Sequence, residues 1–187
     1  MRRGIKPRQI LNLLFSGEGF VSVIIYLLIF YVLFVYAVMP AVYAFTDISY
    51  ISAVVSSSMD HSSPTIQITY NNWLAENGFN SSSTSHWPFQ DGVPLGSLVV
   101  AYKMPAANIT VGDVIIYTVL TSSGSEDIIH RVISEHEING SYYYTTKGDA
   151  NPESLPFELN IPYTRVVGVV GISIPYLGLP RYLLSLI

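Results

Sequence analysis

The chain has 187 residues, of which 50% are hydrophobic and only 12% are charged, and its net charge is −4. The charged share is about half that of an average soluble domain, and no basic stretch follows residue 8, which argues against a nucleic acid partner. There is no cysteine, which excludes disulfides, thiolate metal sites and a cysteine nucleophile.

The first predicted element is a membrane-spanning helix. Residues 20–39 carry no charge, and twenty helical residues measure about 30 Å, the thickness of the bilayer's hydrocarbon core. Pro40 ends or kinks this helix, and the membrane segment is taken as residues 20–45. Basic residues precede the span, at Arg2, Arg3, Lys6 and Arg8. The next one is Lys103, so the positive-inside rule predicts a single-pass cell-membrane protein with residues 1–19 in the cytoplasm and the rest outside.

Residues 46–178 are predicted to form one extracytoplasmic domain, mainly of antiparallel β-strands. The strand candidates are rich in Val, Ile, Tyr and Thr and are bounded by turn residues; they are 98–102, 113–120, 128–135, 141–146 and 165–174. Asn139 and Gly140 predict a tight hairpin turn, because both residues tolerate positive φ. The Ser- and Asn-rich residues 61–92 are predicted to leave the sheet as a long excursion, in which 68–77 is a candidate short helix.

The excursion also contains four large aromatic residues, which need a surface to bury against; they are Trp73, Phe79, Trp87 and Phe89. The sequence leaves the β domain, the membrane and a partner open as that surface. The final segment, 179–187, is apolar but too short to cross a bilayer. It is predicted to lie in the membrane interface, with Arg181 and Tyr182 at headgroup level, although packing on the domain fits the same pattern.

The histidines are the candidate catalytic bases. His130 lies in an otherwise apolar strand, where an imidazole needs a hydrogen-bonding partner, and by itself it fits a structural histidine as well as a base. His136 lies between two glutamates near a turn and is expected to be solvated. His61 and His86 lie in the excursion near Asp60, but their spacing matches no metal site, so neither a metal nor a cofactor is predicted.

Five short motifs follow the span in a fixed order. The first is Ser56-Ser57-Ser58-Met59, which resembles a Ser-Gly-Ser-Met box; the others are residues 96–102 with 109–117, 129–132 (Ile-His-Arg-Val), 146–152 (Thr-Lys-Gly-Asp-Ala-Asn-Pro) and 166–178. Together they resemble the type I signal peptidases, specifically the archaeal and endoplasmic-reticulum branch. That branch uses a histidine where the bacterial branch uses a lysine. The resemblance covers about residues 20–178, apart from the excursion. The histidine branch, the absence of cysteine and the glycosylation sequons at Asn80, Asn108 and Asn139 together favour an archaeal source.

The resemblance implies a signal-peptidase-like β domain and a serine endopeptidase that cleaves signal peptides from secreted preproteins through an acyl-enzyme. It implies Ser58 as the nucleophile, His130 as the general base and Asp149 as the carboxylate that orients His130. Ser56 and the backbone N–H of Ser58 would stabilise the oxyanion, and Met59 would lie near the substrate. The implied partners are signal peptides, membrane lipid and the secretion translocon.

Anchoring would confine enzyme and substrate to the same layer, because Ser58 follows the span by only about a dozen residues. By analogy with the family, an extended substrate is expected to pair with strand 98–102 by β-addition. Shallow apolar pockets would then admit small side chains and exclude larger ones.

Three positions depart from the family pattern. Ser57 replaces a glycine, Ser97 replaces an aspartate, and Leu155 replaces the second of two aspartates. Leu155 leaves Asp149 as the matching carboxylate, unless a neighbour such as Glu153 is recruited. It also leaves open a catalytically silent signal-peptidase-like module that acts in binding or as a scaffold. A further alternative is a surface protein that uses the excursion for adhesion or complex assembly.

Overall fold

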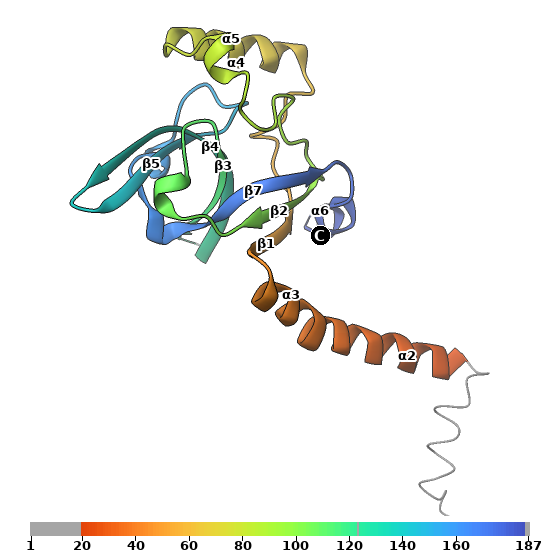
Figure 1. Cartoon of the computed structure of the whole chain (residues 1–187). Helices are drawn as coiled ribbons and strands as arrows, with labels where there is room; N and C mark the ends of the chain where they lie inside the picture. The colour runs from red at the N-terminus through yellow and green to blue at the C-terminus, as the bar shows by residue number, and fades with distance from the viewer. Residues whose placement is uncertain (1–19, 123, 186–187) are drawn as a thin grey trace, which may run out of the picture. The chain divides into compact units, whose positions relative to one another are not determined.

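The computed structural model describes residues 20–122 and 124–185 (Figure 1). The chain divides into two compact units, Met1–Asp47 and Ile48–Ile187. The basic residues within 1–19, on which the predicted orientation rests, lie outside the described residues.

The first unit contains one helix that is long and apolar enough to cross a membrane, Ser22–Phe45. It consists of α2 (Phe20–Leu33), a π-helical turn η1 (Phe34–Val38) and α3 (Met39–Phe45). The π turn comes directly before Pro40, and the N–H of Met39 reaches back to the carbonyl of Phe34. This wider turn lets the helix continue past a residue that lacks an N–H. Pro40 therefore does not end the helix.

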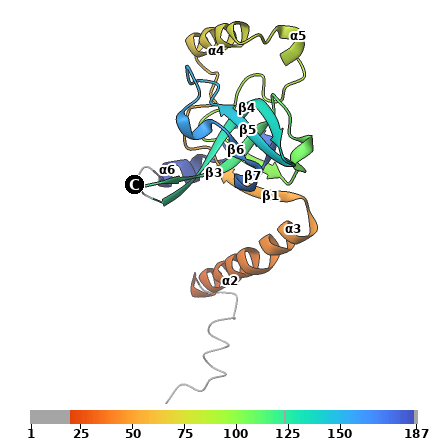
Figure 2. The same ribbon diagram turned by 90° about the vertical axis from the view of Figure 1, so that its left-hand side faces the viewer.

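The prediction of a mainly antiparallel β domain is confirmed. In the described part of the second unit, one seven-stranded sheet has the order β1-β2-β7-β3-β4-β5-β6 (Figures 1 and 2). Its strands are β1 (Ile48–Ala53), β2 (Leu98–Tyr102), β3 (Val114–Thr121), β4 (Gly124–Ile138), β5 (Ser141–Lys147), β6 (Ile161–Pro162) and β7 (Val166–Ile174). All the pairings between these strands are antiparallel.

Alternation along β3 divides the core between the two faces of the sheet. Val114 and Ile116 belong to one buried cluster, whereas Ile115, Tyr117 and Val119 belong to another. Successive side chains of a strand point to opposite faces, so a strand buried on both sides reads as a continuous apolar run. Each of these residues is less than 9% exposed, and this central strand fixes the position of its neighbour β4.

The five predicted strands correspond to β2, β3, β4, β5 and β7, with shifts of a few residues at their ends. The predicted turn is also confirmed, since Asn139 and Gly140 have φ of 51° and 79° between β4 and β5. Two further strands, β1 and β6, were not predicted. Short 3₁₀ turns complete the connections: η2 (Ala106–Asn108), η3 (Pro156–Glu158) and η4 (Tyr163–Arg165).

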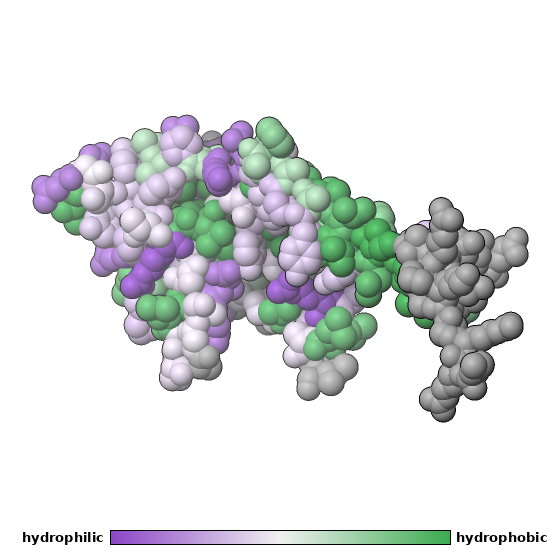
Figure 3. All heavy atoms as spheres, turned by 90° about the horizontal axis from the view of Figure 1, so that it is seen from below, coloured by the Kyte–Doolittle hydropathy of each residue, from purple (hydrophilic) through white to green (hydrophobic). Residues whose placement is uncertain are grey.

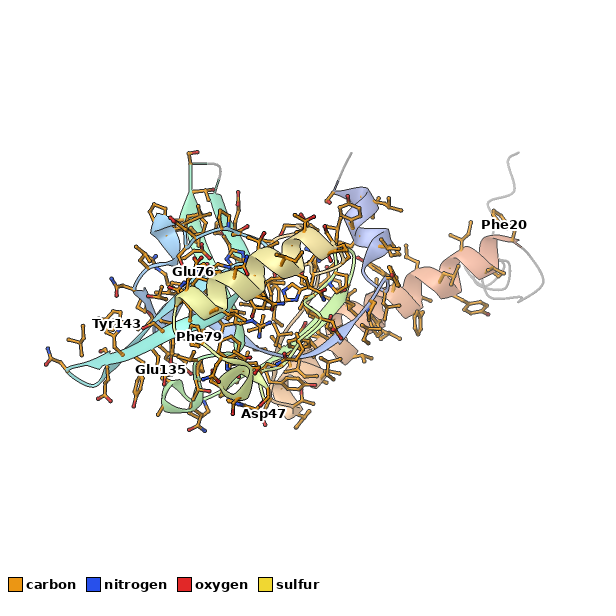
Figure 4. The ribbon with its side chains drawn as sticks, turned by 90° about the horizontal axis from the view of Figure 1, so that it is seen from above. Phe20, Asp47, Glu76, Phe79, Glu135 and Tyr143 are labelled. Atoms are coloured by element: carbon orange, nitrogen blue, oxygen red, sulfur yellow. The ribbon has the colours of Figure 1, made fainter. Side chains whose placement is uncertain are left out.

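Residues 61–92 leave the sheet and form α4 (Pro64–Glu76) and α5 (Ser81–Thr84). Figures 1 and 4 show α4 lying over the strands, with Glu76 at its last turn and Phe79 just beyond it. Tyr70, Leu74 and Trp87 are buried together and pack with aromatic neighbours and with Val111 of the β domain. Of the surfaces considered for these aromatics, the structure places them on the β domain. The last described element is α6 (Leu179–Leu184).

Candidate active site

The Ser56–Met59 segment follows β1 and is fixed by backbone contacts. The carbonyl of Ser58 accepts a hydrogen bond from the N–H of Ala150 at 2.8 Å, and the carbonyl of Met59 accepts one from Val93 at 2.6 Å. The Met59 sulfur lies 3.4 Å from the N–H of Asp149, and Met59 is 1% exposed. The segment is therefore held between the loop after β5 and the loop before β2.

Two serine hydroxyls of this segment lie side by side. Ser56 Oγ is 3.1 Å from Ser58 Oγ, Ser56 is exposed, and Ser58 is half-buried. Ser57, which stands where the resembling family has glycine, is not one of the described residues with positive φ. A serine therefore fits there without the backbone strain that only glycine avoids.

His130 lies on β4, is 4% exposed and contacts a buried carboxylate. Its Nδ1 pairs with Oε1 of Glu158, which is 0% exposed. The other oxygen of Glu158 accepts the N–H of Leu155 at 2.5 Å, and the Thr146 hydroxyl lies 3.4 Å from Oε1. Because an ionised carboxylate only accepts hydrogen bonds, Nδ1 carries a proton and Nε2 is left as the acceptor.

Gly148 marks the place where His130 and the serine segment approach each other. A Cβ built on Gly148 would lie 2.8 Å from His130 Nε2 and 3.0 Å from the carbonyl oxygen of Ser58. Contacts this short leave no space for a side chain. The absence of one at Gly148 thus allows Nε2 to reach the edge of the Ser58 loop.

Ser58 and His130 line one cavity of about 510 Å³. Its wall near these two residues is mostly apolar and includes Val54, Ile116 and Ile129. Its lining also includes polar side chains: Tyr50, Ser125, Glu126, Asp127 and Arg181. Burial and a hydrogen bond to Asp127 raise the pKa of Tyr50. The cavity wall thus combines apolar side chains with polar and charged ones.

This cavity lies between two strand segments that each lack a sheet partner on one side. Among the described residues, β1 pairs with β2 alone, and residues 127–130 of β4 pair with β3 alone, since the β4–β5 register starts at Arg131. By contrast, β2 is hydrogen-bonded to β1 on one side and to β7 on the other. The expectation that strand 98–102 adds an extended substrate is therefore wrong, because that strand has no open edge.

Asp149 does not contact His130 as the sequence-based expectation required. Its carboxylate accepts hydrogen bonds from Arg131 Nε at 3.0 Å and from Arg131 Nη2 at 2.7 Å. His61 Nε2 lies 3.1 Å from Asp149 Oδ2, a close contact that is not aligned as a linear hydrogen bond. Burial opposes ionisation of Asp149, but His61 and the charge of Arg131 hold its pKa below the ordinary value. The carboxylate that meets His130 is Glu158.

Residues of the excursion surround the buried cluster formed by Asp149, Arg131 and His61. Arg131 also donates to the carbonyls of Pro88 at 2.8 Å and Phe89 at 3.1 Å, and its guanidinium lies 5.6 Å from the centre of the Trp87 ring. The excursion therefore covers the side of β4 that carries Arg131.

Lys147 of β5 belongs to the same cluster. Its Nζ lies 4.6 Å from the centre of the Trp73 ring and 5.5 Å from that of Tyr70, and it donates to the carbonyl of Gly148 at 3.0 Å. Burial lowers the pKa of Lys147 to about 8, against the opposing charges of Asp149 and Glu158.

Sequence reasoning missed Glu158 because it lies 28 residues from its partner and belongs to none of the motifs. One local signal exists, since Pro156 followed by Glu158 is typical of the first turn of a helix. Glu153, the neighbour considered for this place, is exposed. His86 is exposed too, and across residues 20–122 and 124–185 no group of His, Asp and Glu side chains is arranged to hold a metal ion.

The comparisons with known proteins give no family for this chain. No protein-family model matches it, and no curated protein matches it significantly.

Proposed function

We propose that this chain is a membrane-anchored serine endopeptidase of the type I signal peptidase kind, with Ser58 as nucleophile, His130 as base and Glu158 as the orienting carboxylate. One observation carries the proposal. His130 is bound at Nδ1 by a fully buried carboxylate and lines the same cavity as Ser58. A serine, a histidine and an acid in this arrangement are the parts that activate a hydroxyl for acyl transfer.

The chemistry begins with attack of Ser58 Oγ on the carbonyl carbon of the scissile peptide bond. His130 Nε2 takes the hydroxyl proton, and Glu158 stabilises the imidazolium that forms. The tetrahedral intermediate collapses when the C–N bond breaks and Nε2 returns the proton to the leaving amine. Water then attacks the ester with the same base, which releases the new carboxylate and restores the Ser58 hydroxyl.

The oxyanion of the intermediate needs donors placed in advance. The backbone N–H of Ser58 is one candidate, and the Ser56 hydroxyl, 3.1 Å from Ser58 Oγ, is the other. Ser56 is exposed, so a substrate can reach it without rearrangement of the core.

β1 and residues 127–130 of β4 each have one edge without a sheet partner, and these two edges could bind an extended substrate. Four antiparallel pairings lead from β1 through β2, β7 and β3 to β4, so β1 and β4 run in the same direction. A peptide strand placed between them would be parallel to both or antiparallel to both, and it would satisfy backbone groups on either side. The apolar wall beside Ser58 suits the small side chains that precede a signal-peptide cleavage point.

The direction of the substrate follows from its attachment to the membrane. The apolar segment of a signal peptide remains in the bilayer, upstream of the scissile bond. Ile48, the first residue of β1, comes three residues after Phe45, the last residue of the span. Upstream substrate residues would therefore lie beside the start of β1, near Tyr50, and the substrate would run parallel to β1 and β4.

Glu158 also bears on the alternative of a catalytically silent module. That alternative rested on Leu155, which stands where the family has an aspartate. A buried carboxylate at Glu158 reaches the same imidazole from three residues further along the chain, which favours an enzyme over a silent homologue.

The deciding experiment compares Ser58→Ala with Ser57→Ala in the full chain, reconstituted in liposomes with a preprotein. Ser57 is an exposed neighbour with the same hydroxyl, so it serves as the matched control. We expect the Ser57 variant to retain cleavage within about tenfold and the Ser58 variant to lose it by a factor of about 10⁴ or more. A wild-type chain that does not cleave, or a Ser58→Ala chain that cleaves equally well, would overturn the proposal.

A further inference from the structure

The C-terminal segment presents large apolar side chains to the outside of the β domain. Residues 176–184 are almost entirely exposed, with Tyr176 at 70%, Leu177 at 56%, Leu183 at 58% and Leu184 at 72%. Figure 3, which views the molecule from below, shows hydrophobic side chains gathered at this end of the chain. We call Tyr176, Leu177, Leu183 and Leu184 the C-terminal patch. Exposed apolar groups gathered in one place indicate an interaction surface rather than scattered single residues.

The patch is held in place by the β domain and does not hang free. The N–H of Gly178 donates to the carbonyl of Gly96 at 2.9 Å. A Cβ on Gly178 would lie 2.5 Å from the carbonyl oxygen of Ser97 and 2.9 Å from the side chain of Ala53, so the backbone is seated closely against β1 and β2. Leu179 of this segment lies close over Gly96, whereas Leu177, Leu183 and Leu184 remain exposed.

The backbone at Tyr176 contributes to this outward presentation. Tyr176 has φ of 65°, a left-handed conformation that is strained for a bulky residue. The strained residue is also one of the most exposed aromatics of the β domain, at 70%.

The short chain connection between α3 and β1 limits which surface the C-terminal patch can bind. Thr46 and Asp47 alone separate α3 from β1, so Tyr50 lies at most about 17 Å from Phe45 along the chain. Arg181 of α6 lines the same cavity as Tyr50, which brings the C-terminal patch close to the start of β1. A two-residue connection thereby tethers the start of β1 to the last residue of a helix long enough to cross a bilayer.

We propose that the C-terminal patch docks on the lipid bilayer, with its leucines among the acyl chains and Arg181 at the level of the headgroup phosphates. An apolar surface with a cationic neighbour is the composition that binds the interface of a membrane. Docking gives the β domain a second attachment besides the span. It thereby fixes the mouth of the cavity at the bilayer surface, where a membrane-bound peptide would enter.

The chain has no cysteine, so a single engineered cysteine can carry an environment-sensitive fluorophore without background labelling. The test uses Leu183→Cys and Leu184→Cys in the full chain, reconstituted in phosphatidylcholine liposomes with and without brominated lipid. The matched control is Ile138→Cys, an equally apolar residue that is 51% exposed at the tip of the β4–β5 hairpin, away from α6 in Figure 1.

We expect a blue-shifted emission that brominated lipid quenches at positions 183 and 184, and an unshifted, unquenched emission at position 138. Equal quenching at all three positions, or none at 183 and 184, would overturn the proposal. A blue shift at 183 that grows with protein density without lipid quenching would assign the patch to a second copy of the chain, which also overturns it. None of these outcomes depends on proteolysis, so the result is independent of the function proposed above.

Discussion

Two neighbouring residues of β4, His130 and Arg131, each meet a buried carboxylate, but on opposite faces of the strand. His130 meets Glu158 on the face that carries Val132, and Arg131 meets Asp149 on the face covered by the excursion. Side chains alternate along a strand, so one carboxylate cannot serve both residues. Alternation along β4, and not the position of Asp149 within a motif, therefore decides which of the two residues Asp149 meets.

The two pairs also differ in what surrounds them. In the Glu158 pair, a ring nitrogen of His130 lies near the cavity. The Glu158 carboxylate also accepts hydrogen bonds from the hydroxyl of Thr146 and from one backbone N–H. The Asp149 pair is enclosed by aromatic side chains and carbonyls of the excursion and includes a permanent cation. The first arrangement can exchange a proton with a ligand in the cavity, whereas the second can only hold structure. Removing each carboxylate should therefore have different consequences.

The largest expected effect is on catalysis, from Glu158→Gln. One oxygen of Glu158 accepts the N–H of Leu155, so the new amide would turn its NH₂ toward His130. Nδ1 would then have to accept, and the proton would move to Nε2, which could no longer act as the base. We expect kcat to fall by a factor of about 10³–10⁴, measured on a preprotein in liposomes. Glu153→Gln, an exposed neighbour, should retain full activity; a Glu158→Gln chain within tenfold of wild type would contradict the assignment.

The next effect is on stability, from Asp149→Asn. Removing one member of a buried ion pair leaves Arg131 as an uncompensated charge and costs about 3–5 kcal/mol. We expect the thermal unfolding midpoint of the full chain in detergent to fall by about 10 °C or more. At a temperature where the variant is folded, kcat should fall less than in Glu158→Gln. If the two variants instead show the same loss of kcat with no loss of stability, the division between the two carboxylates is wrong.

A smaller loss of stability is expected from His61→Ala. The ring of His61 hydrogen-bonds the carbonyl of Gln90 at 3.1 Å, packs 4.7 Å from the Tyr70 ring and approaches Asp149. Losing these contacts should cost about 1–2 kcal/mol, seen in the same unfolding measurement. His86→Ala is the matched control, because His86 belongs to the same excursion but is exposed. Equal stability of the two variants would mean that His61 does not tie the excursion to Asp149.

The sequence predicted the regular elements well because their signals are local. Alternating β-branched and aromatic residues marked β2 and β5 to within a residue, and Asn139-Gly140 marked the turn of the β4–β5 hairpin. β1 was missed because its apolar residues, in Ile-Ser-Tyr-Ile-Ser-Ala, do not alternate regularly with polar ones. It is an edge strand that faces a cavity, and such a role shows only in the sheet order.

The site was predictable where it rests on neighbours in sequence and not where it rests on packing. Ser56, Ser58 and Met59 share one turn, so their proximity follows from spacing. Glu158 reaches His130 only because β5 and the turn η3 bring the two together in the folded domain. The same holds for the excursion, whose helix α4 has few buried apolar residues and gains its place from the contacts of Tyr70 and Trp73 with Lys147.

The smallest expected effect is a change in the pH dependence of stability, from Lys147→Met. Burial lowers the pKa of Lys147 to about 8, whereas the unfolded chain keeps its ordinary value of 10.5. Below about pH 8 both states carry the proton, and the buried charge opposes folding by a constant amount. Between the two pKa values the unfolded state binds the extra proton, so stability rises with pH, by at most about 1.4 kcal/mol per unit. Methionine keeps the packing against Trp73 without the charge, so the rise should disappear when unfolding is followed from pH 7 to about 9.5, before tyrosines titrate. A wild-type chain with no such rise, or a variant that retains it, would show that Lys147 is not the group responsible.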